Sequence, residues 1–455
     1  DEAAQSAQRV SVAAGGRQAL TWWGAVDNVE TVSLVFHASG GGLSDSATPE
    51  GGDIPVLTYS ASATFGTAGM LDQAGARQEQ VALPKSFTPT GGGLEVELSP
   101  SLAAALVSGL QVVETFPDRD MPISLASRLL PNLEAYRTLT DLGADNPALK
   151  TSLDAAIREG VNGLVRTQNS DGGWGWVALR NSDADLSAYI LFALSRAKDA
   201  GAQVPAASIA LAQTYLLTSF GSGEIREGWQ KDRMIFLAWV IQESGAGDQL
   251  STQELVAWRP ELSPWAKALL ILILQPTDDA NAALLLQDVN DAAVRTATGA
   301  HWEDVTGRQQ NHASTVFTTA VVTYALARVD PASPVLVDAV RYLVSTRSSQ
   351  GGWYSPYDTA WALMGLSQAL KGTGDIQASY GFSASLNGAP LASGQADGSN
   401  AFNPVVTRVP LSDLSPDALN TLQIQREGGS GRLYYRAYLQ VDRPVESAQA
   451  VNQGI

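Results

Sequence analysis

Apolar and polar residues alternate with a period of two in two parts of the chain, from the start to about residue 98 and again from about 377 to 442. Segments 94–98 (LEVEL) and 433–439 (LYYRAYL) carry this pattern, which is typical of strands with one buried face. Asn387-Gly388 lies between two such runs and predicts a type I′ hairpin turn. We therefore expect β structure at both ends of the chain.

Between these parts lies an Ala- and Leu-rich block of about 275 residues in which apolar residues recur every three or four positions. Leu186, Ile190 and Leu194 follow this helical spacing. Capping residues stand before prolines, as in Ser263-Pro264, which is typical of a helix start. Such signals predict about a dozen short-linked helices that pack antiparallel, either in an open solenoid or in a closed α/α toroid.

Two stretches of the helical block share one local order: a helix end, two glycines, a tryptophan and then a new helix. They contain residues 172–174 and 351–353, both Gly-Gly-Trp. The glycines allow a turn with positive φ, and the repeat favours the toroid. Nine of the eleven Trp lie between Trp174 and Trp361. We expect these rings to pack in the core and beneath loops. The alternative is that some of them line a ligand cavity in the toroid mouth.

The order of the segments also predicts how the domains connect. Because β parts flank the helices, the simplest topology is a β domain whose chain leaves, builds the helical domain and returns to finish its sheet. A closed toroid suits such an insertion, since it brings its two ends close together.

Composition narrows the classes of function. The chain has 455 residues, 45% of them hydrophobic and 16% charged, which predicts two or three globular domains. A net charge of −17 without a basic cluster argues against nucleic acid as a partner. The longest apolar run, residues 268–274, is too short to insert into a membrane. The absence of Cys excludes disulfides, catalytic thiols and a Cys-derived thioester within this chain.

Several short segments occur in one characteristic order. They are 20–24 (LTWWG), 98–102 (LSPSL), 127–132 (SRLLPN), the two Gly-Gly-Trp turns, 357–361 (YDTAW) and 431–435 (GRLYY). Together they resemble the C-terminal half of the α2-macroglobulin family, and more narrowly its bacterial members. The resemblance implies a multidomain α+β fold in which a terpenoid-cyclase-like α/α toroid of about 12 helices is inserted into a CUB-type β-sandwich.

The resemblance also implies domain boundaries. Residues 1–45 would be the tail of a macroglobulin-type β-sandwich or a linker, and residues 46–98 the first part of the CUB-type domain. Residues 99–375 would form the toroid, and residues 376–455 the second part of the CUB-type domain. Relatives continue beyond this point, so we expect the chain to be a fragment of a longer protein.

The reactive centre of thioester-bearing relatives is altered here. They carry Cys-x-Glu-Gln just before the segment matched by 127–132, whereas this chain has Met121, Pro122, Ile123 and Ser124 at the former thioester position. Met121 stands about where Cys would be and Ser124 where Gln would be. A thioether cannot serve as nucleophile and acyl carrier as a thiolate does. The resemblance is therefore to the thioester-less class.

Other candidate chemistry has a simpler structural interpretation. Asp183-Ala-Asp185 is similar to the acidic cluster of terpene cyclases but lacks a further acid, which favours helix capping. His301 and His312 are eleven residues apart, a spacing that matches no helical metal motif. We expect no metal, no cofactor and no catalytic residue, although paired acids for glycan hydrolysis remain open.

The resemblance implies a protein that is not an enzyme and that inhibits or traps proteases without covalent capture. It would be periplasmic and would protect the cell envelope, anchored to a membrane through an N-terminal region outside this chain. Its partners would be host or bacterial proteases, and other envelope proteins are a further candidate. The candidate contact surface comprises Asp118, Arg119, Asp120, Trp174 and Trp353. The alternatives are an envelope scaffold that docks partner proteins and a toroid enzyme acting on a glycan or isoprenoid.

Overall fold

The computed structural model describes residues 7–26, 29, 31–56, 60–113, 115, 120–141, 143, 147–222, 227–296, 298–304, 313–348, 350–373 and 375–444. The chain splits into two compact units, which are described separately below. The first comprises Asp1–Ala63, Pro84–Gly91 and Val441–Ile455, and the second comprises Thr64–Leu83 and Gly92–Gln440.

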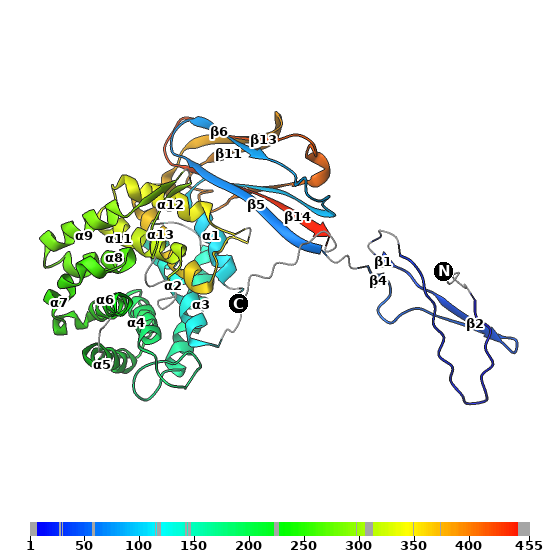
Figure 1. Cartoon of the computed structure of the whole chain (residues 1–455), viewed down its shortest axis with the longest axis horizontal. Helices are drawn as coiled ribbons and strands as arrows, with labels where there is room; N and C mark the ends of the chain where they lie inside the picture. The colour runs from blue at the N-terminus through cyan, green and yellow to red at the C-terminus, as the bar shows by residue number, and fades with distance from the viewer. Residues whose placement is uncertain are drawn as a thin grey trace. The chain divides into compact units, whose positions relative to one another are not determined.

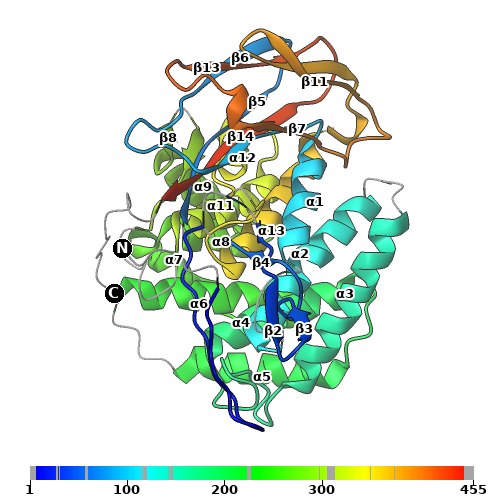
Figure 2. The ribbon, with the colours of Figure 1, turned by 90° about the vertical axis from the view of Figure 1, so that its right-hand side faces the viewer.

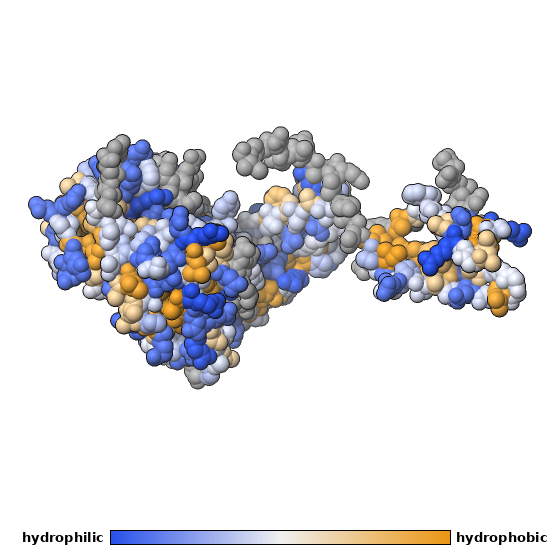
Figure 3. Space-filling view, turned by 90° about the horizontal axis from the view of Figure 1, so that it is seen from below, coloured by the Kyte–Doolittle hydropathy of each residue, from blue (hydrophilic) through white to orange (hydrophobic). Residues whose placement is uncertain are grey.

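The first unit consists mainly of short, exposed antiparallel strand pairs. β1 (Thr31–Val32) pairs with β4 (Ile54–Pro55), and β2 (Phe36–Gly40) pairs with β3 (Leu43–Ala47). Hydrophobic residues lie on its surface (Figure 3). Among its large side chains, Trp23 has 78% and Leu43 80% of its area exposed.

The second unit contains a β-sandwich built from both ends of its sequence. In the described part of the chain, one sheet has the strand order β11-β10-β13-β6 and the other β12-β7-β14-β5. The strands are β5 (Ser60–Leu71), β6 (Gly75–Val81), β7 (Gly91–Ser99), β10 (Tyr380–Leu386), β11 (Ala389–Ala396), β12 (Val405–Pro410), β13 (Asn420–Arg426) and β14 (Leu433–Pro444). Figure 2 shows blue strands beside orange and red ones in this sandwich. Each sheet thus combines strands from before and after the helices, which confirms the predicted split β module.

The hairpin predicted from Asn387-Gly388 is present. These two residues connect β10 to β11 and have φ values of 52° and 84°. Both angles lie in the left-handed region, as a type I′ turn requires.

The helices between the two sets of strands form a closed ring (Figure 1). The inner helices are α2 (Pro122–Asp141), α4 (Ala184–Asp199), α6 (Gly228–Ile241), α8 (Pro264–Leu274), α11 (Thr315–Val329) and α13 (Pro356–Thr373). Each packs against the next in this order, and α13 packs against α2, so the structure is a toroid and not an open solenoid. The outer helices are α1 (Leu102–Val113), α3 (Pro147–Arg166), α5 (Ala206–Ser222), α7 (Thr252–Ala257), α9 (Asp279–Asp291) and α12 (Pro334–Ser345).

Aromatic rings fill the centre of the toroid. Trp361 lies 6.0 Å from Trp239 and 6.2 Å from both Phe192 and Tyr324, measured between ring centroids. All four side chains are fully buried. The expectation that most tryptophans belong to the core is confirmed for these rings, because apolar inner faces from every side of the ring meet here.

The two Gly-Gly-Trp turns are structurally equivalent. Gly172 and Gly351 have φ values of 92° and 96°. The indole N–H of Trp174 and that of Trp353 each donate to a carbonyl in the last turn of the preceding outer helix. The acceptors are Leu164 at 2.8 Å in α3 and Leu343 at 3.1 Å in α12. Each tryptophan therefore gives a helix-end carbonyl a further hydrogen bond, beside the one from Thr167 to Leu164 or from Thr346 to Leu343.

Trp302 repeats this arrangement without a Gly-Gly pair before it. It follows the hairpin of β8 (Val294–Thr296) and β9 (Gly299–His301), and its indole N–H donates to the carbonyl of Val289 in α9 at 2.6 Å. In all three repeats the backbone N–H of the tryptophan donates to a hydroxyl in the first turns of the next inner helix. The acceptors are Ser187 at 2.8 Å, Thr319 at 3.1 Å and Thr359 at 3.0 Å. The sequence motif revealed two of these repeats but missed this one.

A buried ion cluster joins the sandwich to the toroid. Glu97 of β7 lies 2.5 Å from Arg436 of β14 and 3.6 Å from Arg347, which follows α12. The hydroxyl of Tyr380 donates to the carbonyl of Pro100 at 2.7 Å. These contacts fix the strands on either side of the inserted helices to the ring.

Candidate functional site

The segment predicted to be a former thioester position, residues 121–124, lies at the start of α2. Pro122 is the first helical residue, and the backbone N–H of Leu125 donates to the carbonyl of Met121 at 2.9 Å. Pro122 and Ser124 are buried, whereas Met121 and Ile123 are half-buried and Asp120 is exposed. Asp118 and Arg119 lie outside the described residues. The helix start is therefore well formed with Met, Pro, Ile and Ser at the four positions.

The other two members of the predicted contact surface are not on the surface. Trp174 is fully buried, and Trp353 has 8% of its area exposed. Both rings are held inside by their bonds to helix-end carbonyls, so they stabilise the fold and cannot offer a contact face to a partner.

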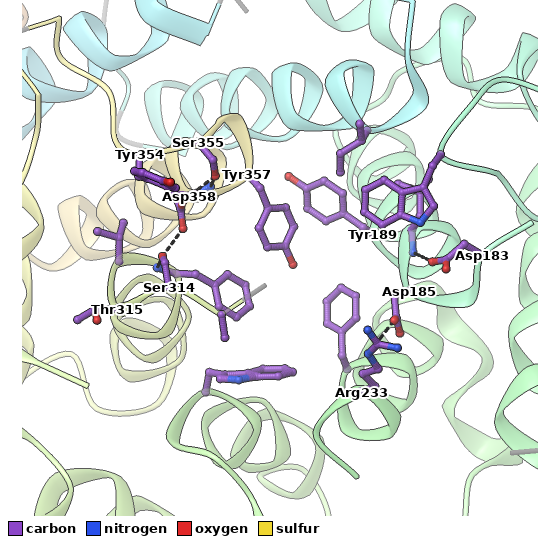
Figure 4. A pocket seen from close by; sticks show the side chains of 18 residues that line it. Asp183, Asp185, Tyr189, Arg233, Ser314, Thr315, Tyr354, Ser355, Tyr357 and Asp358 are labelled. Carbon is purple, nitrogen blue, oxygen red and sulfur yellow. Dashed lines mark hydrogen bonds and ion pairs between the residues drawn. The ribbon is translucent and has the colours of Figure 1, made fainter. Parts of the chain in front are cut away.

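Ile123 also lines a cavity of about 1080 Å³ at the mouth of the ring. Residues near the N-terminal ends of all the inner helices listed above surround it, because these helices run in the same direction (Figure 4). Sequence analysis predicted the toroid and the alternative of a cavity in its mouth, but it did not identify which residues line it.

One wall of the cavity carries Asp183, Asp185 and Arg233. Asp183 caps α4 by accepting from the backbone N–H of Leu186 at 2.9 Å, which confirms the capping interpretation. Asp185 Oδ2 lies 3.0 Å from Arg233 Nε of α6. Burial, together with the charge of Asp183, raises the pKa of Asp185 to about 6 although Arg233 opposes the shift. Asp185 is therefore a carboxyl that changes charge near neutral pH.

The opposite wall carries Asp358 between two serines (Figure 4). One of its oxygens accepts from the hydroxyl of Ser314, the N-cap of α11, and the other accepts from Ser355 at 2.6 Å. The backbone N–H of Asp358 in turn donates to the Ser355 hydroxyl at 3.0 Å. Asp358 is only 3% exposed, so it mainly ties the starts of α11 and α13 together.

Aromatic side chains form the floor. Tyr357 lies 5.0 Å from Tyr189 in an edge-on arrangement and 5.2 Å from Phe317 in a stacked one. Trp265 contacts Phe317 at 5.4 Å. Burial raises the pKa of Tyr357 well above its usual range, so its hydroxyl stays protonated at neutral pH. The floor is therefore apolar and uncharged.

The other end of the ring is closed by charged side chains. Glu134 of α2 is fully buried and accepts from Arg196 of α4 at 2.9 Å and from Gln368 of α13 at 2.6 Å. Glu243 continues the network to Arg328 at 3.1 Å. Burial alone would raise the pKa of Glu134, but the adjacent Arg196 and Arg137 lower it, so this carboxylate is charged. Together with the aromatic rings at the centre of the toroid, this network closes the cavity at the end opposite its mouth.

Of the two histidines considered in the sequence, the structure describes His301. His301 stacks on Tyr342 at 4.7 Å and lies 3.5 Å from Glu303, whereas His312 lies outside the described residues. Within the ranges that the structure describes, no group of three or more His, Cys, Asp or Glu side chains could hold a metal ion. In the same ranges, no helix combines the length and the hydropathy that a membrane span needs.

Comparison with known proteins shows the fold. No protein-family profile and no curated protein sequence matches the chain. Among solved structures, the native α2-macroglobulin of Escherichia coli superposes over 90% of this chain with a TM-score of 0.58 at 16% identity. An E. coli fragment that runs from domain MG7 to the C-terminus superposes over 88% with a TM-score of 0.56 at 17% identity. This chain has the fold of the C-terminal region of a bacterial α2-macroglobulin.

The α2-macroglobulin of Salmonella has the same fold. The structure described as reacted with methylamine superposes over 90% of the chain with a TM-score of 0.55 at 16% identity. The chain spans 24% of the complete E. coli protein and 60% of the E. coli fragment. It therefore corresponds to a part of these proteins and not to the whole.

Proposed function

We propose that this chain is the C-terminal part of a non-covalent protease inhibitor or trap of the α2-macroglobulin kind. It would act in the periplasm, protect the cell envelope and catalyse no reaction. The observation that carries the proposal is the α2-macroglobulin fold over 90% of the chain. Envelope attachment through another part of the protein, and envelope partners other than proteases, are included in the proposal.

The absence of a thioester is the second part of the proposal. The start of α2 carries Met121 and Ser124, and the chain has no Cys. Thioester formation needs a thiolate as nucleophile, and a methionine sulfur bears no ionisable proton. Inhibition would therefore depend on enclosing or blocking the protease by shape and contact.

Methylamine tests the chemical part. The Salmonella protein described as reacted with methylamine is the positive control. We expect the intact mass and the protease response of the full-length protein to be unchanged after incubation with methylamine. A mass increase located by peptide mapping in residues 120–125 would contradict the thioester-less mechanism.

A protease assay tests the biological part. We expect the full-length protein to slow cleavage of a large protein substrate by an added endopeptidase, while cleavage of a small peptide substrate continues. No protease adduct should survive in denaturing electrophoresis. Equal cleavage of the large substrate with and without the protein would contradict the inhibitor function.

A toroid enzyme is the second candidate, because the cavity has carboxylates on opposite walls. Asp185 and Asp358 stand on these walls, and Asp185 titrates near neutral pH. Both oxygens of Asp358 are engaged by serines, which disfavours it as a general acid or base. Release of reducing ends from glycan, abolished by Asp185→Asn, would favour this candidate over the first.

A further inference from the structure

The cavity at the mouth of the toroid has the size of a small-molecule binding site. Its volume of about 1080 Å³ is comparable to pockets that enclose drug-sized ligands. It is closed below by the aromatic floor and by the network around Glu134. A ligand would therefore enter from the N-terminal side of the inner helices.

The charges that line the cavity are unequal. Asp183, Asp185 and Asp358 face a single guanidinium, that of Arg233, among the described lining residues. Arg233 pairs with Asp185. In the part of the chain that the structure describes, Asp183 and Asp358 have no cation within ion-pair distance and accept only from backbone N–H groups and hydroxyls. Among the described lining residues, negative charges therefore outnumber positive ones, and a cationic ligand would balance them.

Helix N-termini usually attract anions, but here capping side chains occupy first-turn donors. The N–H of Leu186 donates to Asp183 and that of Phe317 to Ser314. The N–H of Asp358 donates to Ser355 in the same way. The N–H groups that could bind an anion at these helix starts are therefore already engaged. An anion would also be repelled by the carboxylates of Asp183 and Asp358.

Aromatic rings supply the second half of a cation site. Tyr189, Phe236 and Tyr357 line the interior of the cavity. At the rim, Trp176 has 47% and Tyr354 94% of its area exposed. The negative face of an aromatic ring attracts an organic cation, and the ring also buries the apolar part of such a ligand.

We propose that the cavity binds an organic cation with an apolar body: the ammonium group lies against Asp183, beside the Asp185–Arg233 pair, and the body lies against the aromatic rings. The inference is independent of the proposed protease inhibition, because it concerns only the toroid mouth. It assigns a ligand class, not a reaction.

Three probes with one body and different charges test the proposal by isothermal titration calorimetry. They are 3-phenylpropyltrimethylammonium, 3-phenylpropanol and 3-phenylpropionate. We expect saturable binding of the ammonium and at least about tenfold weaker binding of the other two, since all three carry a phenylalkyl body but only the first has a positive head group. Equal binding of all three, or preference for the carboxylate, would overturn the proposal.

Three variants locate the site. Asp183→Asn keeps a capping side chain for α4 but removes the charge, and we expect about tenfold weaker binding of the ammonium. Tyr354→Ala removes an exposed rim ring, and we expect a loss of about two- to fivefold. Asp338→Asn, on α12 outside the cavity, is the matched control and should bind as the unaltered protein does.

The outcomes separate clearly. Circular dichroism confirms that each variant is folded before titration. Unchanged affinity in both Asp183→Asn and Tyr354→Ala would overturn the proposal, because the cation would then bind elsewhere. Tighter binding of chitotetraose than of the ammonium would also overturn it and would favour the glycan-directed enzyme instead.

Discussion

At the closed end of the toroid, Glu134 lies between Arg196 and Gln368, whereas at the open end Asp185 pairs with Arg233, its one cationic partner among the described residues, and faces a cavity. The same inner helices supply both ends. The closed end pairs its carboxylate with enough positive charge to keep it ionised, and the pKa of Glu134 falls. At the open end burial outweighs the single partner, and the pKa of Asp185 rises.

The two ends of the toroid therefore contribute differently to folding stability. A buried carboxylate with a lowered pKa contributes stability above its unfolded value and loses it as the pH falls. A buried acid with a raised pKa does the opposite, because folding then favours the protonated form. The closed end therefore stabilises the ring at neutral pH, whereas at the open end the described carboxylates outnumber the described cations.

The largest effect is expected at the closed end. Glu134→Ala leaves Arg196 buried without its carboxylate, and we expect the free energy of unfolding to fall by about 3–5 kcal/mol. Urea unfolding followed by far-ultraviolet circular dichroism measures this change. Asp185→Asn at the open end is the comparison, and we expect it not to lower this free energy, because burial already disfavours the charged form of Asp185. Similar losses in both variants would remove the distinction between the two ends.

A carboxyl near the open end should have a pH-dependent effect. Burial raises the pKa of Asp232 to about 7, and its Oδ1 accepts from the N–H of Ser263 at 2.9 Å. Asn can keep that acceptor without the charge, so we expect Asp232→Asn to be more stable by about 2–4 kcal/mol at pH 8. The gain should shrink by more than half at pH 5, where the native Asp232 is largely protonated. A gain that is the same at both pH values contradicts this assignment of charge.

The smallest effect is expected at the loop of Trp353, where the hydrogen bond to Thr359 involves no charged group. Thr359→Val removes the acceptor of the Trp353 backbone N–H while keeping the shape of the side chain. We expect a loss of about 1–2 kcal/mol, independent of pH between 5 and 8. Thr346→Val, at the exposed end of α12, is the control and should have little effect. A strong pH dependence would mean that the loop is coupled to the charges of the cavity.

Much of the architecture could be predicted, because it depends on patterns among residues that are close together in the sequence. The Asn387-Gly388 hairpin, the helical block and the two Gly-Gly-Trp turns each follow from neighbouring residues. Trp302 could not be recognised as a third repeat, because a hairpin ending at His301 replaces the glycine pair. Trp174 and Trp353 were predicted as a contact surface, but only the packed structure places their rings inside.

The sequence by itself determined that the chain alternates β, α and β blocks and that it has no thiol for a thioester. These conclusions need only residue identity and local periodicity. The tertiary structure alone decided that α13 packs against α2 to close the ring, and that Asp185 and Asp358 come to opposite walls of one cavity. Such residues are far apart in the chain, and their shared environment, charge state and exposure depend on the packing of the whole toroid.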